Sequence, residues 1–556
     1  MSLLPRPIRH FVNRKRELSE IKRFLNKNDS QNDCRCILLH GSVGMGKTSI
    51  AVKAVNEILD ADSETVVAYV NCRFVASLDD LAGKIAKQLY HFPFREPAIG
   101  RIKSLLIEEE NFHPLLLLDN FEFLVQLDDG RSMEMQAERR FPSEKTEIMK
   151  FFRDIATKSK KVHLLVTSSK NIDILQTSQQ WIKLLPFNED DSLQLLKKVY
   201  GDTPLEKETA CKIAHCCGGI PFVLFALAAW QDNPTDLLEM LTNPDRKEKF
   251  TRISDATEDE KIEVCIDVCF NRLDTFHQNT LVSLTVFRGL FTTSRASRIL
   301  KSAELRGAID ELARRSFLEQ HISDPYHYSI LTVYSLYCQN KTIETPFREV
   351  FSDSRKMFIN YVLAFLEETF RSFLSTDVSK AIVEYRREDE IIMQLIHWFG
   401  GKGSMEKDQE KRCTDVFNKV GELLAKMMGK KTFEGAFTQL KDKCEESKDA
   451  KRLGECLTSL GIKEVFSCCC SPDLCDEAAR RAKPYLLEAD RIQSDLGIST
   501  GNSRAQCLAK LGRCLVKGHS FTEGKEKIRQ AIDIRKARGE ADIVMLGATY
   551  NDLAGG

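Results

Sequence analysis

The sequence predicts an α/β P-loop nucleotide-binding domain with a parallel sheet, followed by a series of helical domains. A glycine-rich phosphate loop follows an apolar strand, and further apolar strands alternate with helical stretches. In the C-terminal third, apolar residues recur every three or four positions, as they do on the buried face of a helix. The 556 residues provide room for three or four domains.

The composition excludes several classes of protein. Basic and acidic residues both number 81, so the chain has no bulk charge with which to coat nucleic acid or an anionic membrane. The N-terminus lacks the apolar stretch of a signal peptide, and the longest apolar run, residues 220–230, is too short to cross a bilayer. We therefore expect a cytoplasmic protein whose 18 cysteines are reduced thiols.

The phosphate loop reads Gly-Ser-Val-Gly-Met-Gly-Lys-Thr at residues 41–48, directly after the predicted strand 36–40. Glycines let backbone N–H groups surround phosphate oxygens, and the next helix presents its positive end to them. We expect Lys47 to reach the β- and γ-phosphates and the Thr48 hydroxyl to ligate Mg²⁺. The residues predicted to bind the phosphates are Gly41, Gly44, Gly46, Lys47, Thr48 and Ser49.

A second buried strand, residues 115–119, ends in Asp119. A carboxylate at this edge of a parallel sheet is a predicted Mg²⁺ ligand, acting through water, and Asp119 and Lys47 are the predicted catalytic residues. The next residue is Asn120, and the nearest acid is Glu122. Because asparagine cannot accept a proton from water, we expect slow ATP hydrolysis, as in a protein whose conformation is switched by the bound nucleotide.

Two more apolar runs, residues 65–70 and 162–167, are predicted to join the sheet. His163 lies within the second run, and we expect it to be a core residue. The polar stretch 126–145 is predicted to be a surface insertion.

The order of motifs resembles the NB-ARC group of STAND ATPases, which includes the apoptosome scaffold and plant disease-resistance proteins. Residues 11–18, Phe-Val-Asn-Arg-Lys-Arg-Glu-Leu, are similar to the lead-in of that family, and the resemblance implies that Val12 and Arg14 contact adenine. The Gly-Gly-Ile-Pro of residues 218–221 resembles the GxP element of the helical lid, which implies that Pro221 packs on adenine. Residues 185–193 resemble the loop that enters this lid, with Asn188 as the predicted N-cap.

The segment 266–291 is similar to the winged-helix domain of the same family, with a later helix at 309–317 and a hairpin at 320–330. Acidic residues interrupt its arginines, so we expect it to pack within the protein rather than on DNA. The chain departs from the family at two positions. The sensor arginine falls on Ser169, which leaves Lys170 as a candidate γ-phosphate sensor, and the histidine that commonly holds ADP falls near Leu331.

Small and large residues alternate over 508–531 in the pattern of a tetratricopeptide helical hairpin. The pattern recurs at a spacing of 42 residues and resembles the longer repeats of kinesin light chains. Such arrays expose a concave face for a protein partner. The chain stops early in a further repeat, so we expect the sequence to be part of a longer protein. The alternative is an irregular helical bundle.

Two clusters of cysteine and histidine raise the possibility of zinc sites. The first combines Cys211, His215, Cys216 and Cys217, and the second combines residues 468–470 with Cys475. Neither has the paired spacing of a zinc knuckle, so we expect buried thiols.

We predict a P-loop domain at residues 7–183, a helical lid at 184–250, a winged helix at 255–345, a helical linker at 350–450 and repeats at 451–556. The function predicted is a signalling ATPase of the apoptotic or innate-immune type, switched by ATP or ADP with Mg²⁺. We expect nucleotide-dependent homo-oligomers and a protein partner on the repeats. The alternatives are a repeat scaffold with a structural nucleotide and a transcription regulator that binds DNA through the winged helix.

Overall fold

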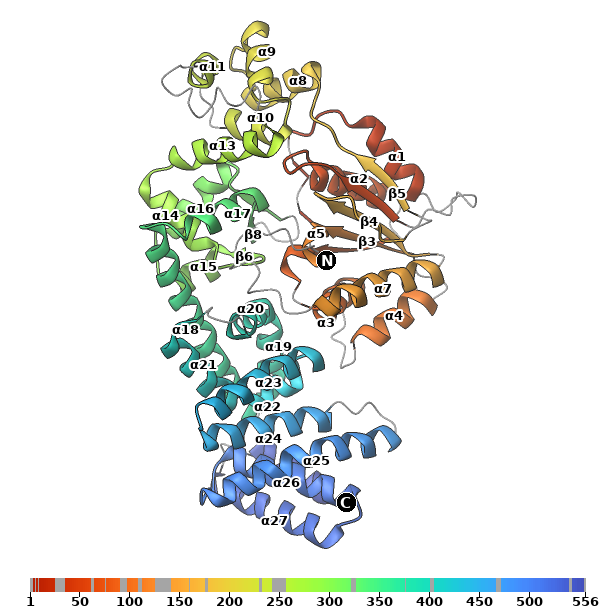
Figure 1. Ribbon diagram of the computed structural model, residues 1–556, viewed down its shortest axis with the longest axis vertical. Helices are drawn as coiled ribbons and strands as arrows, with labels where there is room; N and C mark the ends of the chain where they lie inside the picture. The colour runs from red at the N-terminus through yellow and green to blue at the C-terminus, as the bar shows by residue number, and fades with distance from the viewer. Residues whose placement is uncertain are drawn as a thin grey trace. The chain divides into compact units, whose positions relative to one another are not determined.

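The computed structural model (Figure 1) describes residues 4–5, 7–8, 10–25, 36–61, 65–75, 77–90, 98–108, 113–125, 142–159, 161–175, 179–229, 233–242, 257–321, 327–375, 377–400, 405–466, 472–539 and 543–554. These residues divide into two compact units. The first contains nearly all described residues up to Met357, and the second begins at Phe358.

A five-stranded parallel sheet forms the centre of the nucleotide-binding part of the first unit, as the sequence predicts. Its strands are β1 (Cys36–His40), β2 (Val66–Asn71), β3 (Pro114–Asp119), β4 (His163–Ser168) and β5 (Gln179–Lys183). The spatial order is β2-β3-β4-β1-β5. Strand β5 was not predicted, because it is a short edge strand with three exposed residues and no continuous apolar run.

Helices cover both faces of this sheet, with α1 and α2 on one side and α3, α4 and α7 on the other (Figure 1). Their bounds are α1 (Lys15–Leu25), α2 (Lys47–Ala61), α3 (Leu78–Tyr90), α4 (Ala98–Glu108), α5 (Glu122–Val125) and α7 (Pro142–Lys158), with the 3₁₀ turn η1 (Cys72–Phe74) after β2. Helix α2 begins at Lys47, so the phosphate loop leads directly into it. Most of the predicted insertion, residues 126–141, lies outside the described residues.

Four short helices follow the sheet: α8 (Glu189–Tyr200), α9 (Lys207–Cys216), α10 (Pro221–Ala228) and α11 (Pro234–Thr242). The predicted N-cap is confirmed, because the Asn188 side chain accepts a hydrogen bond from the Asp191 backbone N–H at 2.8 Å. Pro221 opens α10, at a position where a helix needs no N–H donor.

The first unit then continues through α13 (Glu258–Asn271), α14 (Thr275–Leu284), β6 (Phe291–Thr292), α15 (Thr293–Leu300), α16 (Leu305–Arg314), β7 (Leu318–Gln320), β8 (His327–Ile330) and α17 (Thr332–Lys341). The three strands form a small antiparallel sheet in the order β6-β8-β7. We call residues 275–341 the small-sheet segment. The strands of the predicted hairpin pair as expected, whereas its predicted turn at 323–325 lies outside the described residues.

Every element of the second unit is a helix in the part of the chain that the structure describes. Helix α18 (Phe347–Leu374) leads into α19 (Val378–Arg387), α20 (Asp389–Gly400), α21 (Lys407–Lys419), α22 (Gly421–Met427), α23 (Lys430–Glu446), α24 (Ala450–Phe466), α25 (Pro472–Asp495), α26 (Asn502–Lys517), α27 (Phe521–Ala537) and α28 (Ile543–Ala554). The predicted helical C-terminal region is thus confirmed.

Glycines let α26 and α27 approach closely. A Cβ atom on Gly512 would lie 2.6 Å from the carbonyl oxygen of Gly524, and a Cβ on Gly524 would lie 2.7 Å from that of Gly512. In the preceding pair, a Cβ on Gly461 of α24 would lie 2.5 Å from Leu486 of α25. Leu486 lies 42 residues before Ile528, its counterpart in α27, whereas Gly461 lies 51 residues before Gly512. The 42-residue spacing therefore holds for the second helices of these two pairs and fails for the first.

The cysteines follow the prediction only in part, because Cys217 is buried as expected whereas Cys211 and Cys216 are partly exposed. Thirteen described cysteines are free, and the described residues contain no group of three or more metal-binding side chains. The expectation of reduced thiols is wrong for Cys475, which is disulfide-bonded, because bonding depends on which sulfurs meet in the fold and not on their number. Residues 468–470 lie outside the described ranges. No described helix is long and apolar enough to cross a membrane.

Candidate functional site

The candidate site lies at the carboxyl edge of the parallel sheet. Because β4 is inserted between β1 and β3, the ends of all three strands are neighbours. They carry the phosphate loop after β1, Asp119 at the end of β3 and Thr167 near the end of β4. Ligands of open parallel sheets bind outside this edge.

The phosphate loop has the backbone that its sequence predicts. Gly44 and Gly46 have φ angles of +81° and +84°, which glycine adopts readily and other residues rarely do. The Lys47 Nζ donates hydrogen bonds to the carbonyl oxygens of Gly41 and Ser42 at 2.8 and 2.9 Å. Phosphate oxygens are stronger acceptors for an ammonium group than these neutral carbonyls, so the lysine is placed to exchange one for the other.

The two predicted Mg²⁺ ligands are in direct contact. The Thr48 hydroxyl donates to Asp119 Oδ1 at 2.7 Å, and Asp119 is only 2% exposed. The Thr167 hydroxyl also donates to Oδ1, at 2.5 Å, and the Tyr69 hydroxyl donates to Oδ2 at 3.3 Å. Burial raises the pKa of Asp119, and the hydrogen bonds from Thr167 and Thr48 oppose this shift. Paired carboxylate and hydroxyl oxygens of this kind fit a Mg²⁺ ion.

Asn120 occupies the position where a second acid would activate water. It adopts a left-handed conformation with a φ of +58°, which asparagine tolerates. Its Nδ2 donates to Asp119 Oδ2 at 2.9 Å and to Asn71 Oδ1 at 3.2 Å. Glu122 is buried, and its Oε2 has no hydrogen-bond partner among the described residues. Asn120, the residue after the predicted Mg²⁺ ligand, is thus held in place as a hydrogen-bond donor.

Thr167 is a site residue to which the sequence analysis assigned no role. Besides bonding Asp119, its hydroxyl accepts a hydrogen bond from the Asn120 N–H at 3.0 Å. The one feature of the sequence that could have indicated this role is a polar residue near the end of an apolar strand. The side chain of the neighbouring Ser168 accepts a bond from the Lys170 backbone N–H at 3.0 Å, so the turn after β4 is ordered by side chains.

The predicted adenine-contacting segment is fastened to the start of the lid. The Arg14 guanidinium is buried, donates to the Leu185 carbonyl oxygen at 2.5 Å and lies 4.8 Å from the centre of the Phe187 ring. The Asn13 amide donates to both carboxylate oxygens of Asp191 at 2.7 Å. Val12 is buried as well. The structure therefore brings residues 12–14 together with the loop that leads into the predicted lid.

Helix α10, which belongs to the predicted lid, contacts the phosphate loop directly through its first turn. The Phe222 N–H donates to the Gly44 carbonyl oxygen at 3.1 Å, and a Cβ on Gly44 would lie 3.0 Å from the Cβ of Phe222. Ile220 and Ile262 of α13 are each 3.4 Å from the same position. Pro221 is next to this contact. The contact of Phe222 with the phosphate loop was not predicted, because the position after Pro221 is the one feature of the sequence that points to it.

The turn before α10 also depends on a glycine. Gly219 has a φ of +66°, and a Cβ there would lie 2.3 Å from the Phe187 carbonyl oxygen. We expect Gly219→Ala to lower the free energy of unfolding by about 1–3 kcal/mol, because both the backbone angle and the contact oppose a side chain. Scanning calorimetry should show this as a lower melting temperature. Gly307→Ala is the matched control, since a Cβ there meets nothing within 4 Å. Equal melting temperatures for the two variants would contradict the prediction.

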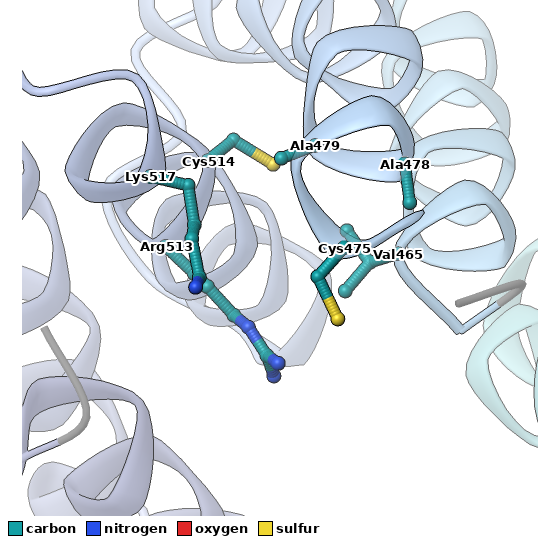
Figure 2. Close-up of a pocket in the computed structure, with 7 residues that line it drawn as sticks. All are labelled: Val465, Cys475, Ala478, Ala479, Arg513, Cys514 and Lys517. Atoms are coloured by element: carbon teal, nitrogen blue, oxygen red, sulfur yellow. The ribbon is translucent and has the colours of Figure 1, made fainter. Parts of the chain in front are cut away.

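A pocket in the second unit lies between α24, α25 and α26 (Figure 2). Arg513, Cys514 and Lys517 lie on one side and Cys475 on the other. Arg513 pairs with Asp552 at 3.1 Å and Lys517 with Asp476 at 3.9 Å. Burial raises the pKa of Cys514 to about 11, so this thiol is protonated at neutral pH. We assign no ligand to this pocket.

A family model described as an AAA domain matches residues 30–173, which include the phosphate loop, Asp119 and Thr167. An uncharacterized WD repeat-containing protein of Nostoc sp. is 28% identical over 128 residues. The match covers 21% of this chain and only 10% of the length of that relative. The family match agrees with the geometry of the site, and the sheet with its loop is a P-loop NTPase domain.

Two solved structures resemble the chain at low identity. A STAND protein with a tetratricopeptide repeat sensor from Pyrococcus horikoshii is 13% identical, with a TM-score of 0.45, and the alignment covers 99% of this chain and 80% of that chain. The ORC2 protein of Aeropyrum pernix is 15% identical, with a TM-score of 0.32, covering 64% of this chain and 95% of that chain. Both TM-scores lie below 0.5, so neither similarity carries a functional inference.

Proposed function

We propose that this chain is a nucleotide-switched ATPase of the STAND type, in which ATP or ADP bound with Mg²⁺ controls assembly. The observation that carries the proposal is the hydrogen bond from Phe222 at the start of α10 to Gly44 of the phosphate loop. Through this bond, any displacement of the loop by a nucleotide acts directly on the lid. Such a contact suits a switch, because it makes the position of a second domain depend on what the loop holds.

The residues at the sheet edge have different roles in binding the nucleotide and Mg²⁺. Bound nucleotide would supply the phosphate charge, and Mg²⁺ would neutralise part of it. Lys47 donates hydrogen bonds to the phosphates, and the oxygens of Thr48 and Asp119 ligate the metal. Thr167 and Tyr69 hold the Asp119 carboxylate in one orientation through their hydroxyl groups. Because these partners are already in place, little ordering is needed when the phosphates arrive.

The contacts to the base and to the terminal phosphate are part of the proposal. Val12, Arg14 and Pro221 contact adenine, since the segment 10–14 and the start of α10 both adjoin the loop that enters the lid. Ser49 lies in the first turn of α2, beside the phosphates. Lys170 meets the γ-phosphate from the turn after β4. With Asn120 in place of an acid, hydrolysis is slow and the bound state persists.

The helical C-terminal unit completes the proposal as the part that senses a protein partner. Its support is the close pairing of α24 with α25 and of α26 with α27 at glycines, which is the packing that a tetratricopeptide hairpin needs. We further propose that residues 255–345 form a winged-helix domain and that the signal belongs to an apoptotic or innate-immune pathway.

Light scattering of the purified chain tests the switch. We expect the measured mass to rise when Mg²⁺-ATP replaces Mg²⁺-ADP, because the two nucleotides favour different lid positions. Mass spectrometry of the nucleotide that stays bound through purification shows whether the purified chain holds ADP or ATP. A mass that is the same with ADP, with ATP and without nucleotide would contradict the proposal and favour a scaffold whose nucleotide is structural.

A further inference from the structure

The first turn of α17, at the end of the small-sheet segment, contacts two other parts of the first unit through adjacent side chains. The Ser335 hydroxyl accepts a hydrogen bond from the Arg73 guanidinium at 2.6 Å, and Arg73 lies in η1, directly after β2. The Tyr334 ring lies 5.6 Å from the ring of Phe222, in the first turn of α10. Tyr334 and Ser335 are both buried. This turn of α17 therefore bridges the edge of the parallel sheet and the predicted lid.

Further contacts hold both ends of this bridge in place. On the sheet side, the Asn71 side chain caps η1 and accepts a hydrogen bond from the Arg73 backbone N–H at 3.2 Å. The Arg73 guanidinium also lies 6.0 Å from the centre of the Phe123 ring of α5. On the other side, the Tyr334 ring lies 4.3 Å from the Phe317 ring of its own segment. The bond between Arg73 and α17 thus joins two ordered parts of the protein.

Phe222 connects the bridge to the phosphate loop. Its N–H donates to the Gly44 carbonyl oxygen at 3.1 Å, and a Cβ on Gly44 would lie 3.0 Å from the Phe222 Cβ. Phe222 can leave the loop only if its contact with Tyr334 is lost or if α17 moves with it. A guanidinium bond to a buried hydroxyl opposes the second movement, because a hydrogen bond from a charged donor is stronger than one between neutral groups.

We propose that Arg73 is a positioning residue that slows release of the nucleotide. Its bond to Ser335 holds α17 at the sheet edge and, through Tyr334, keeps Phe222 on the phosphate loop. Because this bond joins two protein side chains, it needs no side-chain contact between α17 and a phosphate, which Leu331 could not make. The inference rests on the proposed function, and it adds two residues, Arg73 and Ser335, to which the sequence analysis assigned no role.

The rate at which a fluorescent ADP analogue dissociates from the full chain tests this role. We expect Arg73→Ala and Ser335→Ala each to release the analogue about tenfold faster than the wild type, because each removes one charge-assisted hydrogen bond. Ser335→Ala removes a single oxygen atom, so it tests the bond even if Arg73→Ala folds poorly. Asn340→Ala is the matched control, since Asn340 lies in the same helix and is exposed; its release rate should equal that of the wild type.

The double variant separates this bond from unrelated effects of the two substitutions. If Arg73 and Ser335 act through one bond, the double variant should release the analogue no faster than the faster single variant does. Independent effects would multiply to about 100-fold and would overturn the inference. Arg73→Lys keeps a cation that can donate, and it should release the analogue more slowly than Arg73→Ala.

Hydrogen exchange of the chain without nucleotide gives a second readout. The amides of α17 should exchange faster in Ser335→Ala than in the wild type, whereas those of β3 should be unchanged. Equally faster exchange in α17 and β3 would indicate general destabilisation and would overturn the inference, as would unchanged exchange in α17. Unchanged ADP release in both single variants would overturn the inference alone. A wild-type chain that binds no ADP would overturn the proposed function and, with it, the role of Arg73 in release.

Discussion

A Lys47→Ala variant should lose nucleotide binding, with a dissociation constant for ATP or ADP at least about 100-fold weaker than that of the wild type. Lys47 is the one side-chain cation of the phosphate loop, and it is already held over the loop by bonds to Gly41 and Ser42. A hydrogen bond between charged groups contributes about 1.5–3 kcal/mol, and loss of the attraction to the phosphates adds to this. Titration calorimetry with each nucleotide measures the change.

Lys53→Ala is the control for this variant. Lys53 lies in the same helix, α2, but its side chain is 38% exposed and pairs with Glu57 at 3.4 Å. Its removal should leave nucleotide affinity and melting temperature close to wild type, because exposed pairs within a helix contribute little. Nucleotide-dependent assembly should disappear in Lys47→Ala and persist in Lys53→Ala. If Lys47→Ala binds ADP as tightly as the control does, the assignment of the site is wrong.

The second large effect is expected in the helical unit, where Gly512→Ala should lower the free energy of unfolding by about 2–3 kcal/mol. The added Cβ would lie 2.6 Å from both the Gly524 carbonyl oxygen and Ile528 of α27. Neither the backbone oxygen nor a fully buried isoleucine can move away cheaply. The helices must therefore separate, and the melting temperature of this unit should fall by roughly 5–10 °C.

Gly435→Ala provides the comparison for Gly512→Ala. Gly435 lies inside α23, and a Cβ there would meet nothing within 4 Å. Alanine is the better helix former by up to about 1 kcal/mol, so this variant should be as stable as the wild type or more stable. Calorimetry and urea denaturation of both variants measure the difference. A Gly512→Ala variant that matched Gly435→Ala would show that α26 and α27 do not meet at these glycines.

Several parts of the fold could be predicted from local sequence because local chemistry decides them. The strands before Gly41 and before Asn120 are continuous apolar runs, which only a strand buried on both faces needs. The edge strand β5 was not predicted because Trp181 and two of its neighbours are exposed to solvent, so this strand has no continuous apolar run. An edge strand is selected by the strand beside it, and here each residue of β5 pairs with a residue of β1 that lies 143 positions earlier in the chain.

The predicted site residues were those within motifs, and the missed ones were those outside them. Thr167 contacts Asp119, and Phe222 contacts the phosphate loop, only because the chain returns to this edge of the sheet. A threonine near the end of a strand or a phenylalanine in the first turn of a helix is common in any sequence. Their importance depends on neighbours that lie tens or hundreds of residues away, and no local pattern encodes that distance.

The sequence by itself determined the loop conformation, the pairing of Thr48 with Asp119 as predicted Mg²⁺ ligands and the presence of helical hairpins, because these depend on glycine backbones, oxygen ligands and helical periodicity. Only the tertiary structure decided that β4 separates β1 from β3 and that the Phe222 N–H at the start of α10 donates to the Gly44 carbonyl oxygen. It also decided that the 42-residue spacing fails between Gly461 and Gly512. Strand order and domain contacts are set by the packing of whole elements, whose free energy is a property of the assembled core and not of any one segment.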